Sequence, residues 1–201
     1  MTWFEGLERL VPLTVVTAIV LFVIKEVIEV VRRQQSRARK TSAIRTLLIE
    51  EMELNNWTIK SLRSTLEAID NQMESDPQTE FYLKKDASGA FHYRYRISTG
   101  GDGGASIPHV HRKHFDAFLP ELAEVDKRLF EEARKGYERI GQLEHVRSRL
   151  IAHLAEDDPD EKMHLQGFPS YALQVIDDVE SQMSAFYVFC SGRPFEKIRL
   201  R

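Results

Sequence analysis

The sequence is short of the features that identify a chemistry, and each shortage excludes a class of protein. It has one cysteine in 201 residues, Cys190, which excludes an internal disulfide framework and favours a reducing compartment. Cys190 ends the apolar run 186–190, a setting typical of a buried side chain rather than a reactive thiol. The Gly-rich stretch 99–104 lacks the Lys-Ser/Thr pair of a phosphate-binding P-loop. We therefore expect no cofactor.

Positive charge is scarce after the first quarter of the chain. Residues 1–49 carry eight Lys/Arg and four Asp/Glu, a net charge of +4. Residues 50–201 carry the other 20 Lys/Arg and 27 Asp/Glu, a net charge of −7. Affinity for nucleic acid depends on clustered Lys and Arg that face phosphates. The acidic balance of residues 50–201 therefore argues against a nucleic-acid partner.

Charge is absent from residues 10–24, and this run predicts an N-terminal transmembrane helix. Fifteen helical residues span about 22 Å, so apolar residues within 3–7 and 27–31 must extend the helix across a hydrocarbon core of about 30 Å. A signal peptide requires a basic start and a small-residue cleavage site, and this segment has neither. An interfacial helix requires a polar stripe, and only Thr14 and Thr17 are polar here. A buried helix of a soluble domain is the remaining alternative. We expect a membrane anchor over residues 1–31.

The flanks of this run predict the orientation of the anchor. One basic residue, Arg9, precedes the run and seven follow it by residue 45. The positive-inside rule then places the amino terminus outside the inner membrane and the following domain in the cytoplasm. Residues 32–45 read as a basic juxtamembrane segment that serves either as a topology signal or as a contact for anionic lipids. Its basic residues are Arg32, Arg33, Arg37, Arg39, Lys40 and Arg45.

Glycine and proline are absent from Leu13 to Asp76, which favours one long helix. A joint near 34–42, with Thr41 or Ser42 as a new N-cap, is the alternative. Beyond it, apolar residues recur at steps of three and four, as in a helix–helix seam, and Asn55 is the polar member that either fixes the register or sits at a wetted edge. We expect an interface between helices here. Its residues are Leu48, Met52, Asn55, Ile59, Leu62 and Leu66, and the pattern continues through Ile69 and Met73.

The rest of the sequence predicts a cytoplasmic helical domain over residues 46–201. Alternating residues predict a β-hairpin at about 80–97, followed by a flexible Gly-rich loop at 99–104. Steps of three and four predict a short helix near 113–119 and long helices over 120–156 and 169–190. The fold class is therefore mainly α, with one transmembrane helix, a helical bundle and a hairpin insert.

Two groups of residues are candidates for chemistry. His109, His111 and His114 are weak candidates for metal ligands, because no neighbouring Cys or acidic cluster completes a site. Arg147 and His153 have five residues between them, and Arg139 and His145 repeat that spacing. The segment Arg147-Ser-Arg-Leu-Ile-Ala-His153 resembles the Arg-x4–6-His motif of HEPN ribonucleases, with Ser148 where that family more often has Asn, His or Asp.

The HEPN resemblance implies a helical bundle and metal-independent RNA cleavage by paired subunits. A bundle behind one membrane helix is also similar to membrane proteins that accompany RNA-targeting CRISPR effectors. We nevertheless expect a non-enzymatic, membrane-anchored helical protein that forms homo-oligomers or recruits a protein partner at the cytoplasmic face. A ribonuclease and a pore, with Lys25, Glu26 and Glu29 at its mouth, are the alternatives in antiviral defence.

Overall fold

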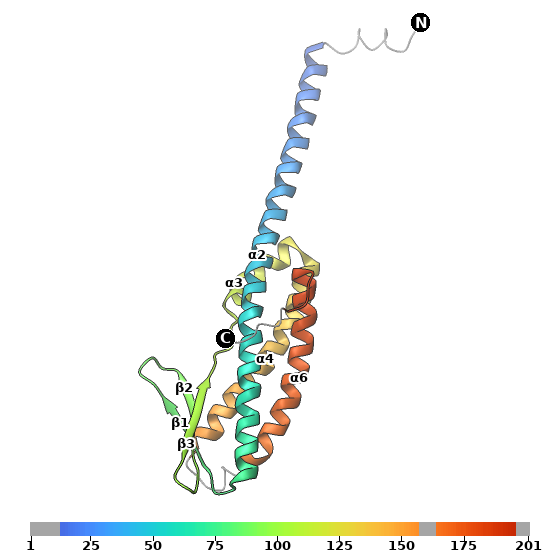
Figure 1. The fold of residues 1–201 in the computed structure, drawn as a ribbon. Coiled ribbons are helices and arrows are strands. Elements are labelled where there is room, and N and C mark those ends of the chain that lie inside the picture. Colours follow the sequence, from blue (N-terminus) through green and yellow to red (C-terminus); the bar gives the residue numbers. More distant parts are fainter. Residues whose placement is uncertain (1–12, 157–163, 196–201) are drawn as a thin grey trace. The chain divides into compact units, whose positions relative to one another are not determined.

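The chain divides into two compact units, residues 1–43 and residues 44–201, and one helix contributes to both. A computed structural model describes residues 13–156 and 164–195 (Figure 1). The elements follow one another as α2 (Leu13–Ser75), β1 (Glu80–Lys85), β2 (Phe91–Arg96), β3 (Asp102–Ile107), α3 (Lys113–Val125), α4 (Lys127–Ala155) and α6 (His164–Ser191).

The predicted transmembrane anchor over residues 1–31 is wrong. Across residues 13–156 and 164–195, no helix has both the length and the apolar character that crossing a bilayer requires. The uncharged start of α2, residues 13–24, is about 18 Å long, and Lys25, Glu26 and Glu29 follow it at once. Residues 3–7, which the prediction used to lengthen the span, lie outside the described residues. The single-pass inner-membrane topology predicted from this anchor is overturned with it.

Helix α2 has no joint at the predicted position. It continues through 34–42, and Thr41 and Ser42 lie inside the helix instead of capping a new one. The absence of Gly and Pro from residues 13–76 explains this continuity, because neither residue interrupts the backbone hydrogen bonds. The long helix ends at Ser75, just before Pro77.

The predicted helical bundle is confirmed in residues 44–201. Its core contains apolar residues of α2 from Ile44 onward together with those of α4 and α6, and α4 packs closely against α6. Gly136 permits this close packing, since a Cβ atom there would lie 2.9 Å from Cδ1 of Phe186. Core side chains that are fully buried include Leu62, Leu66, Leu129, Ile140, Leu143, Ile176 and Met183.

The predicted hairpin is part of a three-stranded antiparallel sheet with the order β1-β2-β3. The stretch 99–104 was expected to be a loop, but β3 begins at Asp102 and pairs with β2, with Ala105 opposite Tyr93. Gly103 and Gly104 fit because aromatic and backbone atoms of β2 fill the space that a Cβ atom would need. Strands β1 and β2 pack against α4, which buries Phe81 and Tyr93.

The helix predicted over 120–156 is divided at Asp126. Pro120 lies inside α3 rather than at the start of the long helix. Asp126 has an extended backbone, and its carboxylate accepts a hydrogen bond from the Leu129 backbone N–H at 3.0 Å. This is the N-cap geometry that begins a new helix, here α4. The helix predicted over 169–190 begins earlier, at His164, with Pro169 inside it.

Candidate functional site

The heptad residues of α2 that were predicted to form an interface are covered by their own chain. All six, from Leu48 to Leu66, are fully buried in the core of residues 44–201. The seam therefore packs against helices of the same bundle, and it is not available to a second copy. This corrects the expected position of a self-association surface. Heptad spacing indicates that a helix face is covered, but a helix of the same chain and a helix of a second copy cover it equally well.

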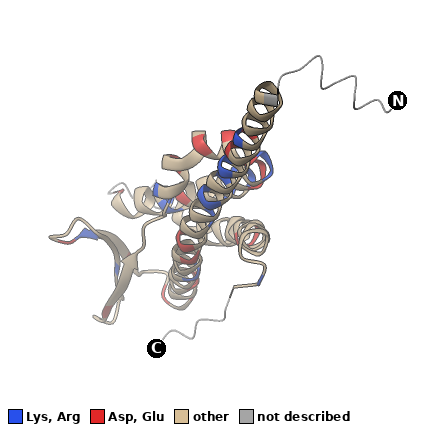
Figure 2. Ribbon diagram, turned by 90° about the horizontal axis from the view of Figure 1, so that it is seen from above, with Lys and Arg blue, Asp and Glu red and all other residues tan. Residues whose placement is uncertain are grey.

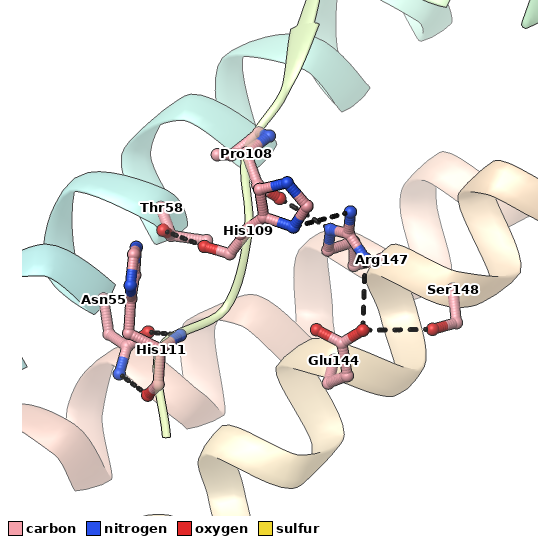
Figure 3. Close-up of polar contacts among 8 residues, drawn as sticks. All are labelled: Asn55, Thr58, Pro108, His109, His111, Glu144, Arg147 and Ser148. Atoms are coloured by element: carbon pink, nitrogen blue, oxygen red, sulfur yellow. Dashed lines mark hydrogen bonds and ion pairs between the residues drawn. The ribbon is translucent and has the colours of Figure 1, made fainter. Parts of the chain in front are cut away.

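Polar residues of α2 hold the backbone that leads from β3 into α3 (Figure 3). The amide of Asn55 donates to the carbonyl of His111 at 2.7 Å and accepts from the His111 N–H at 2.8 Å. The hydroxyl of Thr58 donates to the carbonyl of His109 at 2.8 Å. Asn55 thus neither fixes a pair of chains nor sits at a wetted edge, but anchors a loop.

Arg147 completes the same anchor from α4. Its Nε donates to the carbonyl of Pro108 at 2.6 Å, and its terminal nitrogens contact Glu144 Oε1 at 3.1 Å and His109 Nδ1 at 3.3 Å (Figure 3). The Arg147 side chain is only 8% exposed. Buried donors need acceptors, and the Arg147 guanidinium finds two of its partners in the loop 108–111. These contacts hold the loop against α4.

His153 lies in a different environment, between α4 and α6. Its ring is 5.0 Å from the ring of Phe168 and 6.4 Å from that of His164, measured between centroids. Burial lowers the pKa of His153 below its ordinary value, and the charges of Arg149 and His164 lower it further. The contacts of Arg147 and of His153 have no residue in common. The ribonuclease reading of this pair stays a prediction.

The three clustered histidines do not converge on one point. His109 and His111 are bound to α2 through their backbone carbonyls, and the His114 N–H donates to Glu51. Within residues 13–156 and 164–195 there is no group of three His, Cys, Asp or Glu side chains that could hold a metal ion.

Glu51 is a polar site that the sequence analysis missed. Its carboxylate is 1% exposed and accepts from the backbone N–H groups of His114 at 2.8 Å and Phe115 at 3.1 Å, and from the Tyr137 hydroxyl at 2.5 Å. Burial raises the pKa of Tyr137, and the hydrogen bond to Glu51 and its charge raise it further. Glu51 therefore caps α3 from another helix. The signal that could have found it is the place of Glu51 one turn after Leu48 and directly before Met52, beside the buried row of α2.

An exposed apolar surface lies on α2 between residues 15 and 31. Twelve large hydrophobic side chains there are 43–62% exposed, whereas the few exposed ones in the described part of the bundle are spread over α2, β1 and α6. The apolar character surrounds the helix as far as Ile24, and from Lys25 onward the charged side chains occupy one side. The exposed residues are Val15, Val16, Ile19, Val20, Leu21, Phe22, Val23, Ile24, Val27, Ile28, Val30 and Val31.

The predicted basic segment divides between the two units. In Figure 2 the basic residues of α2 appear as blue bands. Arg45 belongs to the bundle, where it lies 4.0 Å from Asp126 and over the ring of Phe189. The other five residues of the segment are exposed, namely Arg32, Arg33, Arg37, Arg39 and Lys40.

No protein-family model matches the chain, and neither the curated proteins nor the solved structures include a significant match. The function therefore has to be argued from the residues alone, because a fold by itself does not determine it. The two features that need an explanation are the exposed apolar residues 15–31 of α2 and the buried polar contacts of the bundle.

Proposed function

We propose that this chain is a non-enzymatic, self-associating helical protein that assembles through residues 15–31 of α2. The observation that supports this proposal is the exposure of twelve large hydrophobic side chains within seventeen residues of one helix. Contiguous apolar surface is costly to leave in water and is typical of an association surface. By contrast, the nuclease reading has no specific observation in its favour.

A second copy of the chain is the partner that the spacing favours. Five valines at positions 16, 20, 23, 27 and 30 follow one another at steps of four and three, the spacing at which identical helices interdigitate. A second apolar row at positions 21, 24, 28 and 31 lies beside the first. Two adjacent rows let each helix contact two neighbours, so we expect more than two copies in the assembly.

The charged side of the segment is suited to stay in water. Lys25, Glu26, Glu29 and Arg33 mix both signs, and Arg33 lies 3.4 Å from Glu29 one turn away. Exposed pairs of this kind add little stability, about 0–1 kcal/mol, but they keep that face hydrated. Association is therefore expected through the valine rows and not through the charges.

Sedimentation of the full chain tests the proposal with a matched pair of variants. Val23→Asp places a charge in the valine row, and Lys25→Asp places the same charge two residues away on the hydrated side. We expect a concentration-dependent mass of several copies for the wild type, the same mass for Lys25→Asp, and a monomer for Val23→Asp.

A cross-linking experiment tests the helix pairing directly. The native thiol of Cys190 is buried, and burial raises its pKa to about 12, so a new surface thiol dominates oxidation. Val23→Cys should form a dimer across the seam and Lys25→Cys should form much less. A wild type that stays monomeric at every concentration, or that forms only a fixed complex with a different protein, contradicts the proposal.

A further inference from the structure

Strand β3 has a free edge whose hydrogen-bonding groups can be assigned. It pairs with β2 on one side only, since the sheet order is β1-β2-β3. The Ile97 N–H donates to the carbonyl of Gly101 at 2.9 Å, so the pairs at odd positions exchange hydrogen bonds along this ladder. The backbone groups of Asp102, Gly104 and Ser106 then point away from β2. All three residues are exposed.

The two edges of the sheet differ in their protection. Strand β1 has charged residues at its edge, with Glu80, Lys84 and Lys85 among its six residues, and it packs against α4. Strand β3 has the sequence Asp-Gly-Gly-Ala-Ser-Ile and no lysine. Natural sheets block free edges with lysine, proline or a covering element, because an unpaired edge accepts another strand. Asp102 is the one charged residue of β3 and lies at its start, so Gly104 and Ser106 are left without such a block.

A groove lies between the sheet and α2 along this edge. It has a volume of about 290 Å³ and is lined by Trp57, Ser61, Ser64 and other residues of α2, and by Tyr93 and Ala105 of the sheet. Tyr93 and Ala105 are paired residues on the sheet face that faces α2. Trp57 is 48% exposed, an unusual exposure for the largest apolar side chain.

Basic groups lie beside the edge on both faces of the sheet, and the acid of β3 is Asp102 at the start of the strand. Lys60 is the charged side chain in the groove lining. On the opposite face, the side chain of Arg94 extends over Gly104, where a Cβ atom would lie 2.8 Å from its Cδ. A strand added beside β3 would place alternate side chains towards each of these basic groups. Charge complementarity therefore favours an acidic strand.

We propose that β3 and the adjacent face of α2 form a docking groove for an extended, acidic peptide segment of a partner protein. The segment adds as a fourth strand beside β3, and its main chain pairs with Gly104 and Ser106. Its inward side chains enter the groove beside Trp57, and an acidic side chain reaches Lys60. Strand addition draws affinity from the main chain and specificity from the pockets, so the partner is defined by pattern and charge. This site is independent of the assembly through α2.

A displayed library of random dodecapeptides is the probe for this groove. Ser106→Pro removes an outward N–H without touching the ladder to β2, and Lys85→Pro makes the matched change at the edge of β1. Ser64→Arg fills the groove from the helix side. It replaces Ser106→Pro as the blocking variant if the proline variant fails to fold. The Trp3→Phe background leaves Trp57 as the single tryptophan reporter of binding.

We expect the selected peptides to carry an acid flanked by β-branched or aromatic residues. Their binding should shift the emission of Trp57 and weaken at least about tenfold in Ser106→Pro and in Ser64→Arg, with little change in Lys85→Pro. Lys60→Glu should redirect the selection towards basic peptides. The proposal is overturned if no peptide is enriched, or if the selected peptides bind the blocked variants equally well. It is also overturned if the protein self-associates and Ser106→Pro abolishes that association, because a second copy would then occupy this edge.

Discussion

The two halves of α2 have the same repeat of apolar residues and opposite exposure. From residue 44 onward, Leu48, Met52, Ile59, Leu62 and Leu66 are fully buried. Between 15 and 31, the valine row at positions 16, 20, 23, 27 and 30 is exposed throughout. Among the described residues, the elements that can cover a seam of α2 all follow it in the chain and belong to the unit of residues 44–201. A repeat of three and four therefore predicts a face that requires cover, without identifying what covers it.

The largest contrast between the halves is expected from one charge placed in each seam. Leu62→Asp buries an unpaired carboxylate in the core, so we expect a loss of about 3–5 kcal/mol in the free energy of unfolding, or no folded domain. Val23→Asp should leave the unfolding of residues 44–201 unchanged. Chemical denaturation followed by circular dichroism measures both. Ser64→Asp, exposed on the same helix, is the control for Leu62→Asp, and equal stability of the two would contradict the assigned core.

An intermediate contrast is expected between two tyrosines that donate to carboxylates of α2. Tyr137 donates to the buried Glu51, and Tyr187 donates to the exposed Glu53 at 2.9 Å. Tyr137→Phe removes a bond to a buried charge and should cost about 1.5–3 kcal/mol. Tyr187→Phe should cost less than about 1 kcal/mol, because water replaces the lost donor. Urea denaturation compares the two, and the reverse order would argue that Glu51 is not the buried anchor.

The smallest effect is expected at His153. His153→Ala should lie within about 0.5 kcal/mol of the wild type, as at an ordinary position near the surface, and the purified chain should not cleave RNA without metal. RNA fragmentation that both Arg147→Ala and His153→Ala abolish would instead favour the nuclease reading.

The pH dependence of stability sharpens the same prediction. Because the pKa of His153 is lowered in the folded chain, the unfolded chain binds its proton first as the pH falls. The wild type should therefore lose a little stability as the pH falls below about 6.5, the ordinary pKa of histidine, and His153→Ala should lose less. Thermal melts across that range, read as the difference between the two proteins, measure the effect.

The sequence predicted most of the helices because local patterns determine them. Steps of three and four located the buried residues of α4 and α6, and the lack of Gly and Pro explained the unbroken α2. The boundary at Asp126 was missed, because a single N-cap inside a continuous apolar pattern is a weak local signal. Strand β3 was missed because Gly103 and Gly104 indicate a loop until Tyr93 and Tyr95 are placed beside them.

The polar contacts of the site could not be predicted from sequence patterns. The backbone partners of Asn55, Glu51 and Arg147 lie 39–64 residues away along the chain, and only the tertiary fold brings them together. The spacing of Arg147 and His153 was visible in the sequence, but their separate environments were not. The error over the apolar segment came from its length, because the fifteen uncharged residues 10–24 were taken as the centre of a longer span that includes the charged residues after Ile24.

The contacts of Glu51 have a consequence for the order of folding. They join positions separated by 63, 64 and 86 residues along the chain, so each closes a large loop. Helices α4 and α6 follow one another along the chain, so their packing can begin next to the connection between them at a lower entropic cost. Glu51 should therefore find its partners after the rate-limiting step, and Tyr137→Phe should accelerate unfolding while leaving the refolding rate nearly unchanged. In rapid-mixing kinetics only the unfolding arm of the chevron should move. The contacts of this carboxylate would then determine the lifetime of the folded bundle rather than its rate of formation.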